Sequence, residues 1–246
     1  MYRPCVVIPV YNHQQKIECL IEAIGDQGYP CIIIDDGSDS HCRSVLEKIA
    51  QRPTVSLIRM DKNSGKGAAV CKGIYAAYSA GYSCALQIDA DGQHNVADIP
   101  VFFAAAQNHP EHIIAGVRVY KNAPKARYYG RMLTDVWVWI NTLSFTIKDS
   151  MCGFRVYPLA QTKALLDKQS VGRRMSFDTD ILVRLYWEGL QVTQIETQVI
   201  YDDQIPSHFD VLKDNVRISL MHAQLFFGMI VRAPKLIMRH FLSTES

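Results

Sequence analysis

Short runs of β-branched and other apolar residues alternate with amphipathic helical stretches over residues 1–117. The strand-like runs are Cys5–Val10, Ile32–Ile34, Val55–Arg59, Ala85–Ile88 and Ile113–Val117. Between the first two runs, Ile17, Leu20 and Ile24 recur at the spacing of a helix with one buried face. This alternation predicts an α/β fold with a mainly parallel sheet flanked by helices. Ligands of such sheets bind beside the carboxyl ends of the strands.

Helices dominate after residue 117. Apolar and aromatic residues follow a helical stripe over 125–147, a second helix is expected over Phe177–Trp187 and a third from about Phe209. One further strand is expected over Val192–Ile200. Neither a repeat nor a linker rich in Pro, Gly or Ser divides the chain, so we expect a single domain over residues 1–246.

Composition argues against several classes of protein. Hydrophobic residues make up 48%, charged residues 20% and the formal net charge is +2, which argues against disorder and against a broad nucleic-acid-binding surface. The seven cysteines are odd in number and form no CxxC pair, so we expect neither a disulfide framework nor a zinc site. The first residues lack a signal-peptide pattern, and no apolar run is long enough to span a bilayer. We therefore expect a cytoplasmic location.

Two aspartates, Asp89 and Asp91, follow the fourth strand-like run, and Gly92 allows the backbone to turn beside them. In an extended segment these side chains point the same way and can share one hard cation, Mg²⁺ or Mn²⁺, with positions left for a diphosphate. An isolated pair of this kind is more often a turn that caps a helix. Its meaning therefore depends on the neighbouring turns.

Two further polar turns belong to the same predicted edge of the sheet. Asp35 and Asp36 follow the second strand-like run, where a carboxylate can accept hydrogen bonds from a nucleotide base or ribose. Asn63–Gly67 leads into a helix, so its backbone amides and Lys66 can approach a phosphate. This segment lacks the spacing of an ATPase phosphate loop. Together the turns indicate a nucleotide site.

Four segments in the N-terminal half, taken in order, resemble the glycosyltransferases of family 2. They are Val6–Asn12, Asp35–Ser38, Asn63–Gly67 and Asp89–Gln93. Downstream, Asp149–Arg155 and Phe177–Arg184 resemble segments of the dolichyl-phosphate mannose synthase-like branch of that family. The resemblance covers residues 4–215. It implies a GT-A fold, with a nucleotide-sugar-binding half at 1–117, a helix-rich acceptor-side half at 118–208 and an amphipathic helical segment at 209–242.

The resemblance also implies an inverting, metal-dependent transfer of a sugar from a UDP- or GDP-sugar, with Mg²⁺ or Mn²⁺ as the metal. The residues implied around the nucleotide are Pro9, Tyr11, Asn12, Asp35, Asp36, Lys66 and Asp89. Asp89 and Asp91 are implied to hold the metal, and Gln93 the diphosphate. Arg118 and Arg155 are candidates for sugar or phosphate contacts, or else are ion-paired or solvated arginines.

The acceptor implied by this branch is a polyprenyl phosphate or another lipid-linked or membrane-associated molecule. If the acceptor is a hydroxyl, a carboxylate has to take its proton, and Asp180 is the candidate base with Asp178 behind it. If the acceptor is a phosphate, no base is required and both aspartates position the sugar. Asp178 is alternatively a helix N-terminal carboxylate favoured by the helix dipole.

The segment Asp202–Asp210 departs from the pattern of the branch. Relatives carry an arginine here that meets the acceptor phosphate, whereas acidic residues occupy these positions in this chain. Ser207 is retained as a sugar or phosphate contact, and His208 is either a third metal ligand or an ordinary loop histidine. This departure argues against a prenyl-phosphate acceptor.

The last helix is apolar on nearly all sides over Leu225–Val231 and is followed by several basic residues. Such a helix suits the surface of an anionic leaflet, so we expect peripheral contact with the cytoplasmic face of a membrane. The alternative is a buried helix that closes the core or forms a dimer seam.

Two other functions remain open from the sequence. A sugar nucleotidyltransferase also uses a parallel sheet and metal carboxylates, but this chain lacks a basic glycine-rich triphosphate loop near the N-terminus. A catalytically silent nucleotide-sugar-binding protein is the other, and the intact acidic pairs argue against it.

Overall fold

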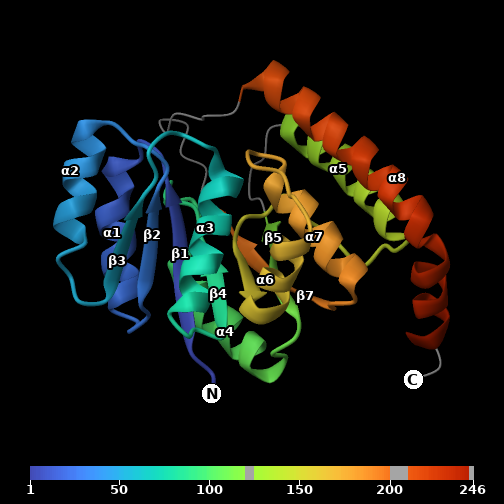
Figure 1. Ribbon diagram of the computed structural model, residues 1–246, viewed down its shortest axis with the longest axis horizontal. Helices are drawn as coiled ribbons and strands as arrows, with labels where there is room; N and C mark the ends of the chain where they lie inside the picture. Colours follow the sequence, from blue (N-terminus) through green and yellow to red (C-terminus); the bar gives the residue numbers. More distant parts are fainter. Residues whose placement is uncertain (120–124, 200–209, 244–246) are drawn as a thin grey trace.

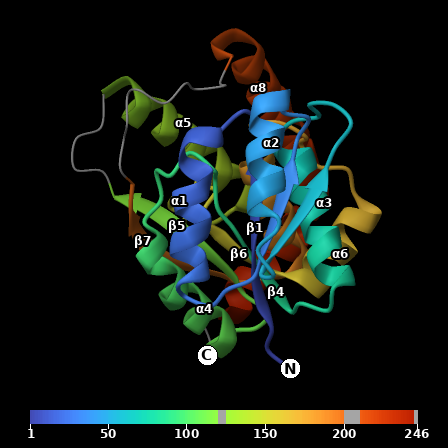
Figure 2. The same ribbon diagram turned by 90° about the vertical axis from the view of Figure 1, so that its left-hand side faces the viewer.

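The computed structural model describes residues 1–119, 125–199 and 210–243. Within these ranges the centre is a seven-stranded sheet with helices on both faces (Figure 1, Figure 2). The strands are β1 (Pro4–Val10), β2 (Cys31–Asp35), β3 (Val55–Arg59), β4 (Cys84–Gln87), β5 (Ile113–Val119), β6 (Arg155–Pro158) and β7 (Val192–Gln198). They lie side by side in the order β3-β2-β1-β4-β6-β5-β7.

Two apolar cores lie on the two faces of the sheet. The helices are α1 (Gln14–Gly25), α2 (Ser40–Ile49), α3 (Lys66–Ser79), α4 (Ile99–Asn108), α5 (Lys125–Thr142), α6 (Leu159–Lys168), α7 (Phe177–Glu188) and α8 (Val211–Ser243), with a 3-10 turn at Val96–Asp98. Successive residues of β1 point to opposite faces: Val7 joins the core under α3, whereas Val6 and Ile8 join the core under α1, α2 and α4. Both faces of the sheet are therefore buried, as a sheet with parallel crossovers requires.

The four N-terminal strands confirm the predicted parallel sheet. β1 pairs in parallel with β2 and β4, and β2 pairs in parallel with β3. Val10, Asp35 and Arg59 lie in register at the carboxyl ends of β1, β2 and β3. The polar turns that follow these strands, and the one that follows β4, therefore open at the same edge of the sheet.

β6 runs antiparallel to its neighbours, and the sequence does not predict it. It has four residues, all of them buried, and pairs antiparallel with both β4 and β5. A buried run this short shows neither alternation nor helical spacing. The register places Arg155 opposite Gln87, so β6 carries the preceding loop to the edge where the N-terminal turns meet. The helices α4 and α6 were also not predicted.

α5 and α8 form a helix pair outside α7 (Figure 1). α8 begins above the carboxyl edge of the parallel strands and has 33 residues. α5 ends at Thr142, earlier than the expected end at Ile147, because Leu143 adopts a left-handed backbone conformation with φ 50°. In the part of the chain that the structure describes, no helix combines the length and the apolar character needed to cross a membrane.

Candidate active site

Asp36, directly after β2, shapes the loop that precedes α3. Its two carboxylate oxygens accept hydrogen bonds from the backbone amides of Ser64 (2.7 Å) and Gly65 (2.8 Å). Gly65 has φ 101°, and a Cβ atom there would lie 2.5 Å from the carbonyl oxygen of Arg173. Burial raises the pKa of Asp36, and the two amide hydrogen bonds oppose this shift. The loop that carries Lys66 is therefore fixed by a carboxylate of the neighbouring strand.

Asp35, the last residue of β2, is buried and contacts two neighbouring segments. Its Oδ1 accepts a hydrogen bond from the backbone amide of Ser38 at 2.8 Å, and its Oδ2 forms an ion pair with Arg59 at the end of β3. Arg59 also donates to the carbonyl oxygen of Ser38 at 2.8 Å. These contacts hold the turn after β2 against β3 and make Asp35 part of the wall of the expected nucleotide site.

The turn after β1 is tied to the turn after β2. Asn12 has φ 54°, donates its backbone amide to Ser38 Oγ at 3.1 Å and accepts a hydrogen bond from the backbone amide of Asp39 at 2.9 Å. Pro9 is buried within β1, and Tyr11 is half-buried beside Asn12. The N-terminal residues expected to bind the nucleotide thus lie at one edge of the sheet.

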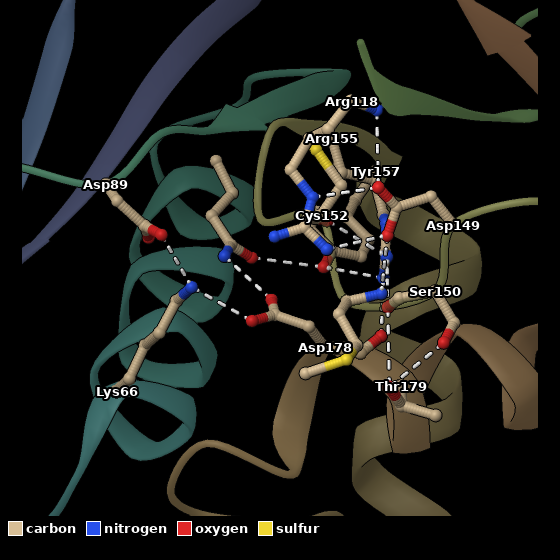
Figure 3. A network of polar contacts seen from close by, with 12 residues as sticks. Lys66, Asp89, Arg118, Asp149, Ser150, Cys152, Arg155, Tyr157, Asp178 and Thr179 are labelled. Carbon is tan, nitrogen blue, oxygen red and sulfur yellow. Dashed lines mark hydrogen bonds and ion pairs between the residues drawn. The ribbon is translucent and has the colours of Figure 1, made fainter. Parts of the chain in front are cut away.

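Lys66, at the first turn of α3, joins the two halves of the site. Its Nζ lies 2.8 Å from Asp89 Oδ2 and 2.9 Å from Asp178 Oδ2 (Figure 3). Asp89 follows β4, whereas Asp178 lies in the first turn of α7. One ammonium group therefore bridges a carboxylate that follows β4 and a carboxylate on α7.

Asp89 and Asp91 have the properties of a partial cation site. Asp89 Oδ1 is buried and has no hydrogen-bond partner among the described residues. Burial raises the pKa of Asp89, but the charge and hydrogen bond of Lys66, together with nearby histidines, outweigh burial and the net shift is downward. Burial, followed by the charge of Asp89, raises the pKa of Asp91 to about 6. Two carboxylates crowded in this way and one unpartnered oxygen fit a divalent cation, which restores the charge balance.

The described residues offer no group of three or more His, Cys, Asp and Glu side chains arranged around a cation. A cation between Asp89 and Asp91 would therefore take its remaining ligands from a diphosphate and water, as Mg²⁺ commonly does. The backbone amide of Gln93 donates to Asp91 Oδ1 at 3.0 Å, which fixes the orientation of that carboxylate.

Arg118 and Arg155, which the sequence offers either as sugar or phosphate contacts or as ion-paired arginines, both bond to groups of the protein. Arg118 forms a bidentate pair with the buried Asp149, at 2.8 Å from Nε and 2.9 Å from Nη2. Arg155 is fully buried and donates to the backbone carbonyls of Ser150, Cys152 and Asp178 at 3.0, 3.1 and 2.7 Å. A sugar or phosphate contact by Arg155 would require these bonds to break, so we assign it to holding the loop before β6.

The two acidic side chains of α7 have different surroundings. Asp178 accepts hydrogen bonds from Lys66 and from Gln87 Nε2, the latter at 2.9 Å. Asp180 accepts from Arg184 Nε at 2.6 Å and from the backbone amide of Gly172 at 2.7 Å. Asp178, which the sequence placed behind Asp180, is thus the one that faces Asp89.

A model of glycosyl transferase family 2 matches residues 5–174. This chain belongs to that family. The match covers the turns after β1, β2 and β4, the loop with Lys66 and the loop before β6. This match identifies the chain as a glycosyltransferase, so the alternative that it is a sugar nucleotidyltransferase is wrong.

Several relatives of this family 2 glycosyltransferase have names that specify dolichyl phosphate. A UDP-N-acetylglucosamine–dolichyl-phosphate N-acetylglucosaminyltransferase of Methanococcus voltae is 23% identical over 217 residues, which cover 80% of this chain and 86% of that protein. A dolichyl-phosphate β-glucosyltransferase of Dictyostelium discoideum is 27% identical over 241 residues, 87% of this chain and 72% of that protein.

Solved structures share the fold of this glycosyltransferase. Glucosyl-3-phosphoglycerate synthase of Mycobacterium tuberculosis, in complex with Mn²⁺, UDP and glucosyl-3-phosphoglycerate, aligns with a TM-score of 0.67 at 13% identity. The alignment covers 94% of this chain and 80% of that one. The fold is therefore GT-A, as the sequence resemblance implied.

Three polar residues of the glycosyltransferase site were not predicted. Gln87 and Tyr157 are each 1% exposed and lie within strands, where a single polar residue gives no periodic signal. His94 is 8% exposed, stacks on Phe154 with ring centroids 5.2 Å apart, and its Nδ1 has no partner among the described residues. Burial lowers the pKa of His94 to about 4. The sequence feature that could have identified His94 as a site residue is its position three residues after Asp91.

The two remaining candidates, Ser207 and His208, lie outside the described residues. Their expected contacts with sugar, phosphate or metal stay predictions.

Proposed function

We propose that this glycosyltransferase moves a sugar from a UDP- or GDP-sugar to a lipid-linked phosphate, with inversion at the anomeric carbon and with a divalent metal between Asp89 and Asp91. The observation that carries the proposal is the buried, unpartnered oxygen of Asp89 beside Asp91, at the carboxyl edge of the sheet. A bound Mg²⁺ or Mn²⁺ would neutralise the charge that develops on the leaving nucleoside diphosphate. The complexes of the mycobacterial fold neighbour with Mn²⁺ or Mg²⁺ and UDP support this assignment.

The residues of the N-terminal half would bind and orient the donor. The turns at Tyr11–Asn12 and Asp35–Asp36 would border the nucleotide, and the loop held by Asp36 places Lys66 at the same edge of the sheet. The amides of Ser64 and Gly65 already donate to Asp36, so the ammonium of Lys66 is the group of this loop that we assign to the phosphates.

The acceptor side favours a phosphate over a hydroxyl. A hydroxyl acceptor needs a carboxylate that can turn toward it, and Asp180 is held in place by Arg184 and the backbone amide of Gly172. Asp178 is likewise held, by Lys66 and Gln87. A phosphate acceptor is already ionised and requires no base. The dolichyl-phosphate acceptors in the names of two relatives support the same choice, and we give them more weight than the missing arginine of the Asp202–Asp210 segment.

The outer face of α8 supports contact with a membrane surface. Large apolar side chains repeat along α8 on the side away from the core, and they are Leu212, Val216, Leu220, Phe227, Ile230, Val231 and Met238. The opposite side of α8 packs inward through Met221, Leu225 and Met229. A helix that is apolar on two opposite faces and carries basic residues suits the headgroup region of an anionic bilayer.

The proposal is tested with purified protein, Mn²⁺, labelled UDP- and GDP-sugars and vesicles that contain a polyprenyl phosphate. We expect a labelled polyprenyl-phosphate sugar, and Asp91→Asn should reduce its formation at least about 100-fold because the cation loses a ligand. Asp26→Asn, at an exposed aspartate that follows α1, is the matched control and should transfer normally. Undiminished transfer by Asp91→Asn would refute the metal assignment, and label on another lipid class would refute the acceptor.

A further inference from the structure

Lys66 occupies an oxygen of the aspartate that is proposed to hold the metal. Its ammonium contacts Asp89 Oδ2 at 2.8 Å and Asp178 Oδ2 at 2.9 Å, and its side chain is only 17% exposed (Figure 3). A divalent cation that approaches the free Oδ1 of Asp89 would meet this ammonium on the other oxygen of the same carboxylate. Two cations at such short separation repel strongly in a partly buried site.

Asp178 is held in place by groups other than Lys66. Gln87 Nε2 donates to Asp178 Oδ1 at 2.9 Å, and Gln87 Oε1 accepts a hydrogen bond from the Tyr157 hydroxyl at 3.1 Å. The Tyr157 hydroxyl thereby fixes which end of the Gln87 amide faces Asp178. Asp178 can therefore keep its position whether or not Lys66 remains on Asp89.

Gly153 limits where the Lys66 ammonium can move. A Cβ atom at Gly153 would lie 2.7 Å from Lys66 Nζ and 3.0 Å from Asp89 Oδ2, so the backbone of this loop closes against the ion pair. Arg155 anchors the same loop through the carbonyls of Ser150 and Cys152. The loop therefore blocks movement of the Lys66 ammonium toward Gly153, and Asp178 is the second carboxylate that the ammonium already contacts.

We propose that Lys66 is an exchangeable cation that neutralises Asp89 before the divalent metal binds and is then retained by Asp178 with its ammonium turned to the donor diphosphate. The inference rests on the proposed donor and metal site. If Lys66 exchanges in this way, its charge weakens the binding of the metal alone and strengthens the binding of the nucleotide in the presence of metal. Removal of Lys66 should therefore change the two affinities in opposite directions, whereas removal of a lysine that only stabilises the fold would change both in the same direction.

Titration calorimetry of Lys66→Met separates these roles. Compared with wild type, Mn²⁺ alone should bind about threefold more tightly because a competing positive charge is gone. UDP or GDP, whichever binds the wild type, should bind about tenfold more weakly at saturating Mn²⁺ because a charged contact to phosphate is lost. Lys72→Met removes the same charge from an exposed position of α3 and should change neither constant. Weaker or equal Mn²⁺ binding by a folded Lys66→Met protein would overturn the proposal.

The variant Asp178→Asn tests the exchange independently. It removes the negative charge that would retain Lys66 but leaves an oxygen to accept the Gln87 hydrogen bond. Lys66 should then stay on Asp89, and Mn²⁺ alone should bind more weakly than it binds to wild type. The double variant Lys66→Met/Asp178→Asn should bind Mn²⁺ at least as well as wild type, because the competitor is absent. If the double variant binds Mn²⁺ as weakly as Asp178→Asn does, the proposed exchange is wrong.

The outcomes for the exchange and for the proposed function are distinct. Wild-type protein that binds neither Mn²⁺ nor a nucleoside diphosphate would contradict both. Wild-type protein that binds both ligands and transfers sugar, with unchanged constants in Lys66→Met, would contradict the exchange alone.

Discussion

At the scale of single residues, the role of each aspartate in the site depends on which groups donate hydrogen bonds or form ion pairs with its carboxylate. Asp178 and Asp180 are two positions apart on α7, yet one contacts Lys66 and Gln87 while the other contacts Arg184 and the Gly172 amide. From the sequence, Asp180 is the candidate base and Asp178 lies behind it. The ranking could not take account of Arg184, which lies one helical turn later and pairs with Asp180.

Replacing Asp180 should therefore mainly affect stability. Asp180→Asn leaves Arg184 without its carboxylate in a largely buried pair, and we expect a loss of about 3 kcal/mol in the free energy of unfolding. Urea denaturation measures this loss, and the transfer assay on the remaining folded protein measures activity. If Asp180 were the base, the opposite pattern would appear, with a large loss of kcat and little change in stability.

Replacing Gly153 should affect the site more than the fold. In Gly153→Ala the new Cβ would press on Lys66 Nζ and Asp89 Oδ2, so the ion pair has to move. We expect kcat/KM for the donor to fall at least about tenfold, because catalysis depends on the exact positions of the charged groups that contact the donor. Gly189→Ala, at a glycine with no atom near its Cβ position, is a control for backbone effects, although its φ of 109° will reduce stability. If Gly153→Ala has the same donor kinetics as wild type, Gly153 does not lie as close to Lys66 and Asp89 as the structure indicates.

The residues of the site that could be predicted lie in turns at strand ends. Asp35, Asp36, Lys66 and Asp89 follow apolar runs or precede a helix, where polar residues stand out. Gln87 and Tyr157 could not be predicted, because their partners lie 91 and 70 residues away and a lone polar side chain in a buried strand has no periodic signature.

At the scale of elements, periodicity predicted the parallel strands and long helices but not β6. The first four strands alternate with helices, and each connection is short, so local patterning determines their arrangement. β6 is a four-residue antiparallel strand inserted between β4 and β5, and its place depends on pairings with distant segments. The same periodicity found α8 but did not separate its two apolar faces. The structure distinguishes the inner face, which packs on the core, from the outer face.

The outer face of α8 should bind lipid without contributing to folding. Phe227 and Val231 are 68% and 80% exposed, one helical turn apart. Changing both to Ser should weaken binding to anionic vesicles at least about 100-fold, since each apolar side chain buried in the interface contributes roughly 1.5–3 kcal/mol. Vesicle sedimentation measures the binding, and thermal unfolding should be nearly unchanged.

Leu225→Ala is the matched control on the inner face. Leu225 is fully buried in the core under α3, so the change should cost about 2–5 kcal/mol of stability and leave vesicle binding by the folded protein unaltered. Vesicle binding that survives the double change at Phe227 and Val231 would show that another surface meets the membrane.

At the scale of the whole molecule, charge is unevenly distributed. α5 and α8 together carry eight Lys and Arg residues against two Asp, and both aspartates, Asp135 and Asp214, are buried. Since the whole chain has 26 basic and 24 acidic residues, the remainder is net acidic. An anionic surface would attract the helix pair and repel the rest of the molecule, which favours one orientation. α8 begins above the carboxyl edge of the sheet (Figure 1), so binding through this helix pair would bring that edge toward the membrane.

Transfer to a membrane-borne acceptor should therefore depend on lipid charge and on salt. We expect transfer to polyprenyl phosphate in vesicles to increase when anionic lipid is added, because each basic residue near the surface contributes on the order of 1 kcal/mol. Raising the salt concentration from about 0.05 M to 0.5 M should reverse the gain by screening. Binding of UDP or GDP with Mn²⁺ in the absence of vesicles provides the control, since it should vary much less over the same range. Equal transfer to neutral and anionic vesicles, with normal nucleotide binding, would show that charge does not orient the enzyme and that apolar contacts alone bring the acceptor to the site.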